Sequence, residues 1–539
     1  MKLTERTSGV LLHLSSLPGP AFCGDLGESA RNFADFLHTA GQTWWQMLPI
    51  NPIDSHFSPY ASVSAFAGEP LYLDLVDLMQ DGLLEPGDID WEPTGPLEQT
   101  AFQAARDYRR IRWHKAFHHF RSGKEGKKYH AAYEPFMEQN GEWVTHHALF
   151  CSIAEQFGTY HWGLWPDEKI RQADPEVLKQ FSRVKEERIS YHIFLQLLFH
   201  VQWSAFRDYC HDKGIGLIGD VPIYVGLASA DTWGYSKLFQ MDKHGRMERT
   251  AGVPADSFNP DGQRWNSPLF RWEAHHEENY RWWTSRIRTC FSRFDVVRLD
   301  HFIGFYNYFS MPEISSTEDH GFWASGPADD FFDAILTEFP RTAFIAEDLG
   351  VMNPGVHALR DKYEFPGMNV YQFCFDFRRN IDPAVEWKSN SVVCSGTHDT
   401  MTLAAWFDDV IADRVKPEPF WDFPSMVASL KHFVPGTESW AARLAEMTPE
   451  RARRLRNAKF PFEPGIHRDS LRWAILQTIM NSPGNTAIFP MQDLLGLGKD
   501  ARMNFPGHTG HNWVWRLHPK SLTQELALAM NDLAFAYQR

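Results

Sequence analysis

Short apolar segments alternate with longer stretches of helical periodicity along most of this chain. Eight of these segments are apolar at consecutive positions, which is typical of parallel strands that are buried on both faces. They are residues 9–14, 43–50, 214–223, 294–300, 343–350, 369–375, 391–399 and 485–493. Eight strands that alternate with helices favour a closed (β/α)8 TIM barrel over an open sheet. We therefore predict a single barrel domain over residues 1–539.

The predicted strands are unevenly spaced, and the long intervals indicate insertions into the barrel. Residues 76–212 are predicted to form a largely helical insertion between the second and third strands, because segments such as 186–210 read as amphipathic helix. Residues 252–270 are rich in Gly, Pro, Asn and Asp, which predicts a loop on the active face. Residues 405–470 are charged and helical in pattern, so a second helical insertion is expected before the last strand.

Polar residues stand at the carboxyl ends of several predicted strands. They are Asp220, Asp300, Glu347, His398 with Asp399, and Asp493. In a barrel of this kind, the carboxyl ends of the strands and the loops that follow them form the active face. One charged residue at a strand end is more often a cap or a structural ion pair. The same feature at five strand ends favours a shared active site.

The segment FDVVRLDHFIGF (294–305) places two opposite charges on one apolar strand. Side chains two apart on a strand point the same way, so Arg298 and Asp300 are predicted to lie together near the strand end. An unpaired buried charge is costly, whereas Arg298 beside Asp300 would favour the ionised carboxylate. A structural ion pair explains the same pattern. His301 and His398 are each explained equally well as core residues or as donors to hydroxyl groups.

Three carboxylates from different strands point to a reaction class. Asp300, Glu347 and Asp399 are predicted to converge, and converging carboxylates are the apparatus of glycoside chemistry. One is ionised and acts as nucleophile, while another is protonated and donates to the leaving oxygen. The third, Asp399, is expected to raise the proton affinity of Glu347 and to bind sugar hydroxyls. Aromatic residues make up 14% of the chain, and these either build a large core or provide flat surfaces for sugar rings.

Composition and charge argue against several classes of protein. The net charge is −15 with both signs scattered along the chain, which argues against a nucleic-acid partner. The six cysteines show no C-x-x-C spacing, so they read as reduced core residues of a cytosolic protein. The sequence shows neither a signal-peptide pattern nor an apolar stretch of about 20 residues. We expect a cytoplasmic protein without membrane association, metal or cofactor, and a monomer or weak homo-oligomer.

Longer motifs make the chain resemble the amylomaltases, the 4-α-glucanotransferases or disproportionating enzymes of the α-amylase clan. The resemblance runs nearly end to end. It includes GVLLHLSSLPGP (9–20), GQTWWQMLPINP (41–52), SPYASVSAFAGEPLYLDL (58–75), GQRWNSPLF (262–270), AEDLG (346–350), GTHDT (396–400), QDLLGLGKDARMNFPG (492–507) and NWVWRL (512–517). The RLDH, AEDLG and THD motifs are shared in looser form across the clan. The N-terminal and C-terminal motifs are more specific to amylomaltases.

The resemblance implies a retaining 4-α-glucanotransferase that moves α-1,4-glucan segments between maltooligosaccharides through a covalent glycosyl-enzyme. Asp300 resembles the nucleophile, Glu347 the acid/base and Asp399 the transition-state carboxylate. The expected substrate-binding residues, including His301 from the strand pattern, are Ser58, Tyr60, Asp220, Trp265, Arg298, His301, Asp376, His398, Asn504 and Pro506. Two alternatives remain open, an α-glucan hydrolase of the same clan and a non-catalytic glucan-binding protein, and the intact trio argues against the second.

Some positions depart from the family pattern. Ser257 stands where a tyrosine is common, and NSPLF (266–270) replaces the usual GNPLY. These changes leave the catalytic trio untouched. They leave open the acceptor preference, the chain-length preference and the ratio of transfer to hydrolysis.

Overall fold

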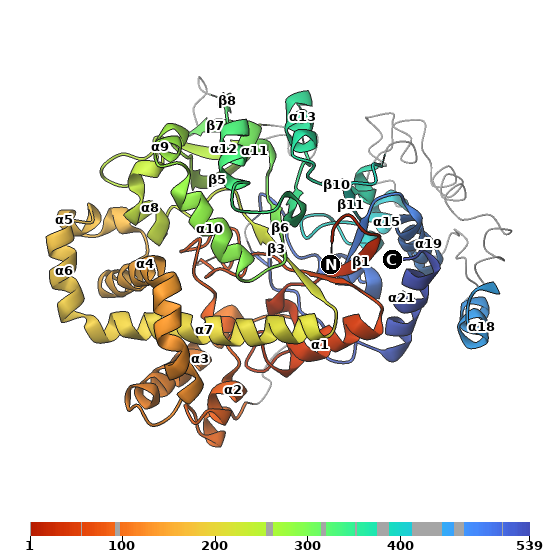
Figure 1. The fold of residues 1–539 in the computed structure, drawn as a ribbon, viewed down its shortest axis with the longest axis horizontal. Coiled ribbons are helices and arrows are strands. Elements are labelled where there is room, and N and C mark those ends of the chain that lie inside the picture. The colour runs from red at the N-terminus through yellow and green to blue at the C-terminus, as the bar shows by residue number, and fades with distance from the viewer. Residues whose placement is uncertain are drawn as a thin grey trace.

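A computed structural model describes most of the 539 residues of this chain. The described ranges are 2–54, 56–91, 97–254, 262–313, 320–350, 353–374, 387–411, 445–457, 468–508 and 510–539. Within them, a central set of strands is surrounded by helices, and a large helical region lies on one side (Figure 1).

Eight parallel strands form a nearly closed barrel. They are β1 (Thr7–Leu11), β2 (Trp44–Gln46), β3 (Gly216–Val221), β6 (Val296–Leu299), β9 (Phe344–Ala346), β10 (Gly367–Val370), β11 (Ser391–Cys394) and β12 (Thr486–Pro490). They pair in the order β10-β11-β12-β1-β2-β3-β6-β9. Between the two ends of this order, the Ala346 N–H donates to the Pro366 carbonyl at 2.9 Å. The predicted (β/α)8 fold is confirmed, and each predicted apolar segment overlaps one of these strands.

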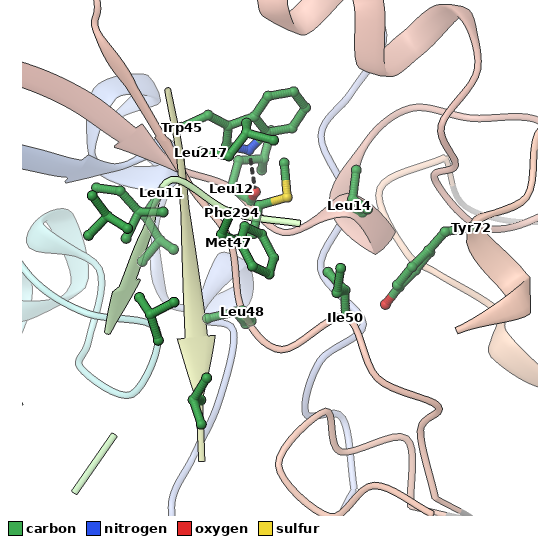
Figure 2. Close-up of a cluster of buried hydrophobic side chains, with 14 of the residues drawn as sticks. Leu11, Leu12, Leu14, Trp45, Met47, Leu48, Ile50, Tyr72, Leu217 and Phe294 are labelled. Atoms are coloured by element: carbon green, nitrogen blue, oxygen red, sulfur yellow. Dashed lines mark hydrogen bonds between the residues drawn. The ribbon is translucent and has the colours of Figure 1, made fainter. Parts of the chain in front are cut away.

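Buried apolar side chains from the strands, the segments next to them and the covering helices form the core. Figure 2 shows one cluster of them, in which Trp45 also donates its indole N–H to the Leu12 carbonyl at 2.7 Å. Gly219 in β3 makes room for this packing, because a Cβ there would lie 2.2 Å from the ring of Phe294. Any larger residue at this position would displace the ring, so the glycine is required by close packing.

Within the described residues, six α-helices lie between β2 and β3. They are α2 (Leu75–Gln80), α3 (Phe102–Arg121), α4 (Lys127–Phe157), α5 (Glu168–Arg171), α6 (Pro175–Val184) and α7 (Glu186–Asp212). Asp74, Asp167 and Asp174 begin three of them by accepting hydrogen bonds from backbone N–H groups of the first turn. These helices occupy the interval that we predicted to be a helical insertion. The division of the chain into units stays a prediction.

A second sheet of four antiparallel strands corrects the prediction of a loop over residues 252–270. The strands are β4 (Arg249–Val253), β5 (Gln263–Pro268), β7 (Asn307–Pro312) and β8 (Phe322–Ser325), in the order β5-β4-β7-β8. The composition of 252–270 is that of a loop, yet β5 is a strand because β4 is available to pair with it. Pairing with a neighbouring strand thus outweighs local propensity. Residues 255–261 lie outside the described residues.

The other α-helices in the described ranges lie between the barrel strands in sequence or follow the last of them. They are α1 (Glu28–Thr39), α8 (Ala230–Gly234), α9 (Trp272–Glu277), α10 (Arg281–Phe291), α11 (Ile303–Tyr306), α12 (Ala328–Ile335), α13 (Pro354–Lys362), α14 (Tyr371–Cys374), α15 (Leu403–Ile411), α18 (Pro449–Asn457), α19 (Arg468–Asn481), α20 (Met491–Leu495) and α21 (Gln524–Ala536). Much of 405–470 lies outside the described residues, so the insertion predicted there stays a prediction. The termini lie close together beside β1 (Figure 1), where Arg539 donates to the Thr7 carbonyl at 3.0 Å.

Side chains with distinctive chemistry are scattered through the described part of the chain. Its free cysteines are Cys23, Cys151, Cys210, Cys290 and Cys394. Within the described ranges, no group of three or more His, Cys, Asp or Glu side chains is arranged to hold a metal ion. None of the described helices is both long enough and apolar enough to cross a membrane.

Candidate active site

The carboxyl ends of three adjacent strands bring four charged side chains together. Asp220 in β3 pairs directly with Arg298 in β6. The ladder continues past the strand ends, because the Asp300 N–H donates to the Val221 carbonyl at 3.0 Å and the Glu347 N–H donates to the Leu299 carbonyl at 3.1 Å. Strand register therefore positions these side chains at one end of the barrel.

Arg298 is the centre of this group. Its Nη1 lies 2.7 Å from an oxygen of Asp220 and 2.7 Å from Oδ1 of Asp300, and its Nη2 lies 3.9 Å from Oε2 of Glu347. Burial opposes the charge of Arg298, but the two aspartates keep its pKa well above the usual value. The predicted pairing of Arg298 with Asp300 is present. The arginine also neutralises Asp220, which the pattern of one strand did not indicate.

Glu347 lies in a drier environment than Asp300. The Glu347 side chain is 11% exposed, whereas that of Asp300 is 23% exposed. The His301 N–H donates to Oε2 of Glu347 at 2.6 Å, and the Leu349 N–H donates to Oε1 at 3.1 Å. Burial raises the pKa of Glu347 to about 8, with Arg298 opposing the shift and Asp300 adding to it. The sequence analysis expected Asp399 to raise the proton affinity of Glu347. Asp300 is instead the carboxylate that raises the pKa of Glu347 most strongly, because Asp300 and Glu347 both lie beside Arg298.

Asp399 is held in its ionised form on the other side of the site. Its Oδ2 lies 3.2 Å from Nε2 of His398, and its Oδ1 accepts a hydrogen bond from the Asn504 amide at 2.6 Å. Partial burial opposes ionisation, but His398 and Asn504 lower the pKa of Asp399 to about 2. The Asp399 side chain is 42% exposed, so its charge is accessible to a ligand.

Tyr60 links the two halves of the site. Its hydroxyl donates to Oδ2 of Asp220 at 2.6 Å, and its ring stacks on His398 with the centroids 5.2 Å apart and the planes at 14°. Trp513 packs against both rings at 5.6 and 5.9 Å. Sequence reasoning did not single out Trp513, although it lies in the NWVWRL motif and this motif was a signal for it.

Tyr60→Phe separates the hydroxyl of Tyr60 from its ring. We expect kcat/KM to fall by about 10- to 100-fold, since a hydrogen bond to a charged group contributes roughly 1.5–3 kcal/mol. The melting temperature should also fall, but by less than in Tyr60→Ala, because the stack on His398 is kept. Tyr60→Ala should cost more, because it also removes the ring. Equal losses in the two variants would assign the contribution to the hydroxyl alone, and no loss in Tyr60→Phe would assign it to the ring.

Trp265 and His301 lie beside the carboxylates. The Trp265 ring meets the imidazole of His301 edge-on, with the centroids 4.7 Å apart. The backbone of His301 has a positive φ of 49°, and its N–H is the group that reaches Glu347. A histidine in this conformation is uncommon, and such strain is found where a backbone group must be aimed. The sequence analysis singled out the imidazole ring of His301, whereas the backbone N–H of His301 is the group that contacts Glu347.

The remaining residues singled out in the sequence lie in turns, in the core or outside the described residues. Ser58 begins a turn, where its hydroxyl accepts from the Tyr60 N–H at 3.3 Å, and Pro506 lies in another turn, directly after Phe505. Asp376 lies outside the described residues, and so does Ser257. Asp493 is buried, and its carboxylate accepts from the Ser395 hydroxyl at 2.6 Å and from the Leu403 N–H at 2.7 Å. These bonds give Asp493 a structural function. The roles expected for the other residues stay predictions.

Comparison with known proteins places the chain among glucan-transfer enzymes. A family model described as 4-alpha-glucanotransferase matches residues 12–523. A 4-alpha-glucanotransferase of Streptococcus pneumoniae is 35% identical over 539 residues, which cover 100% of this chain and 98% of the relative. One from Thermus thermophilus is 34% identical over 542 residues, or 99% of each chain. The solved amylomaltase from Streptococcus agalactiae in complex with acarbose matches with a TM-score of 0.85 at 30% identity, over 99% of this chain and 100% of that one.

Proposed function

Because this chain belongs to the 4-alpha-glucanotransferase family, we propose that it transfers α-1,4-glucan segments between maltooligosaccharides with retention of configuration. The observation that carries the proposal is the contrast between two carboxylates beside Arg298. Asp300 is paired with the arginine at 2.7 Å, whereas burial raises the pKa of Glu347 to about 8. Retaining transfer requires this combination, an ionised nucleophile and a protonated acid.

The first half-reaction uses both groups at once. The Asp300 carboxylate attacks the anomeric carbon of the donor while the glycosidic bond breaks. Glu347 gives its proton to the leaving oxygen, so the released oligosaccharide departs as a neutral alcohol. The product is a glucan joined covalently to Asp300, and Glu347 is left ionised near Arg298. Asp399, whose side chain is 42% exposed, supplies acceptor oxygens for sugar hydroxyls.

The second half-reaction reverses the roles. The 4-hydroxyl of an acceptor glucan loses its proton to Glu347 and attacks the glycosyl-enzyme, which frees Asp300. Two inversions give net retention. Transfer requires the bound acceptor to react faster than water at about 55 M, and an oriented hydroxyl gains effective molarities far above this value. The glucan is thus both donor and acceptor.

Maltotriose as sole substrate tests the function. A transferase should release glucose and build a ladder of longer maltooligosaccharides, while the number of reducing ends stays nearly constant because each transfer breaks one bond and makes one. A steady increase in reducing ends without a ladder would identify an α-glucan hydrolase instead. No reaction with any maltooligosaccharide, combined with tight binding, would identify a non-catalytic glucan-binding protein.

Trp265→Ala tests whether this ring serves the acceptor. We expect the ratio of transfer to hydrolysis to fall, because loss of a stacking surface of about 1–3 kcal/mol weakens acceptor binding relative to water. The first half-reaction, followed with a glycosyl fluoride donor, should change less. If Trp265 only packs against His301, the melting temperature should fall and both half-reactions should slow together. An unchanged ratio beside a lowered melting temperature would contradict the acceptor role.

A further inference from the structure

The loop that follows η7 (Lys499–Ala501) is hydrogen-bonded to Asp399 of the candidate active site. Arg502 donates from Nη2 to the backbone carbonyl of Asp399 at 2.5 Å and from Nε to the carbonyl of Asn504 at 2.7 Å. The Asn504 amide in turn donates to the Asp399 carboxylate at 2.6 Å. A cavity lined by His398, Thr400 and Arg502 lies beside this loop. Hydrogen bonds from Arg502 and Asn504 therefore help to hold Asp399 in place.

Phe505 follows Asn504 and presents an aromatic ring to solvent. It is 36% exposed, while the guanidinium of Arg502 lies over its ring, 4.3 Å from the centroid. The Phe505 N–H donates to the side-chain oxygen of Asn512 at 3.0 Å, which fixes the backbone. One face of the ring is therefore covered by a charged partner that also holds Asp399. Phe505 is thus held in one orientation while 36% of it stays exposed.

We propose that Phe505 is a stacking platform for a glucose unit of the bound α-glucan, and that Arg502 is a positioning residue that fixes this platform relative to Asp399. The proposal rests on the proposed function and adds a subsite to it. Sugar rings present apolar C–H faces that stack on aromatic rings, and their hydroxyls need polar partners nearby. The Asn504 amide and the Asp399 carboxylate, which are bonded to each other, provide such partners next to Phe505.

The chain contains a matched control for this subsite. Phe535 on α21 is also an exposed phenylalanine, at 46%, and the guanidinium of Arg451 lies 4.2 Å from its ring centroid. Helix α21 ends next to the beginning of β1, as the contact between Arg539 and Thr7 shows. The site residues follow the carboxyl ends of the strands, so Phe535 lies toward the opposite end of the barrel. Phe535→Ala removes the same kind of arginine–phenylalanine stack away from the site.

Binding is measured without turnover in an Asp300→Asn background, by calorimetry with maltoheptaose. Phe505→Ala should raise Kd about 10-fold, the value of one sugar–aromatic stack near 1.4 kcal/mol. Phe505→Trp should keep the affinity, and Phe535→Ala should leave Kd unchanged. Unchanged Kd in a folded Phe505→Ala protein would overturn the platform. If the Asp300→Asn protein with Phe505 intact binds no maltooligosaccharide, the proposed function and the subsite both fail.

Arg502→Met and Arg502→Lys test the positioning role in a chain that retains Asp300. Methionine keeps part of the packing but none of the bonds, so kcat should fall at least 10-fold in addition to the loss of affinity seen for Phe505→Ala. Lysine keeps the charge but cannot bond both carbonyls, so it should restore only part of kcat.

Arg516→Met is the control, because Arg516 is buried and donates to the Leu17 carbonyl at 3.1 Å. It should lower the melting temperature without changing the ratio of kcat to KM. A loss of stability in Arg502→Met with unchanged kcat and KM would overturn the positioning role.

Discussion

Asp300→Asn should reduce turnover of maltooligosaccharides by about 10⁴-fold or more, because an amide oxygen cannot act as the nucleophile at the anomeric carbon. The fold should be retained. The asparagine side chain still has an oxygen that can accept from Arg298, whose Nη1 lies 2.7 Å from Oδ1 of Asp300. Initial rates with maltotriose and thermal unfolding of the same preparations measure both effects.

Asp493→Asn is the matched control for this change. Asp493 is also an aspartate at the carboxyl end of a barrel strand, but its carboxylate is buried and bonded to Ser395 and Leu403. We expect Asp493→Asn to lower the melting temperature and to retain most of the activity per folded molecule. Turnover near that of the unaltered protein in Asp300→Asn would overturn the assignment of the nucleophile. A greater loss of activity in Asp493→Asn than in Asp300→Asn would do the same.

The barrel could be predicted because its strands carry their signal locally. Residues 214–223 and 294–300 are apolar on both faces, and a strand buried on both faces needs this composition whatever its neighbours are. The order of the strands then follows from their alternation with helices. β4 and β5 could not be predicted in this way. β5 is a strand because it pairs with β4, and β4 is in turn paired with β7.

The same difference between local and long-range signals explains which parts of the candidate site could be predicted. Arg298 and Asp300 are two apart on one strand, so their proximity follows from the period of the strand. The bonds of Arg298 to Asp220 depend on the register between β3 and β6. Asp493 also matched the strand-end pattern, but its partners are structural. A position at a strand end does not by itself reveal which carboxylates are covered.

Residues from the C-terminal part of the chain were the hardest to place. Arg502 contacts the backbone of Asp399 across 103 positions of sequence, and Trp513 stacks near Tyr60 from still further away. No periodicity links positions so distant. The motifs RMNFPG and NWVWRL indicated that these segments matter. Only the three-dimensional arrangement shows that Arg502 holds a carbonyl while Phe505 presents a ring to solvent.

Glu347→Gln should slow natural glucans by about 10²–10⁴-fold, the range of one general acid–base group. Glutamine cannot give a proton to the leaving oxygen, nor accept one from the incoming hydroxyl. A glycosyl fluoride needs little protonation, so its first half-reaction should be nearly unimpaired in this variant. The second half-reaction still lacks its base, and a covalent glycosyl-enzyme should accumulate. Peptide mass spectrometry should locate the added sugar on Asp300, and an adduct on any other residue would contradict the mechanism.

The pH profile provides a test of Glu347 that needs no substitution. Burial raises the pKa of Glu347 to about 8, so the carboxyl is protonated and able to donate below that pH, and it loses the proton as pH rises through that value. For a natural donor, kcat/KM should therefore be retained up to about pH 8 and then fall about tenfold per pH unit. With a glycosyl fluoride this decline should disappear, because the first half-reaction no longer depends on the proton. It should also be missing from the residual activity of Glu347→Gln. A decline near pH 8 that persists with the fluoride would assign the titration to another group and remove Glu347 from the role of acid.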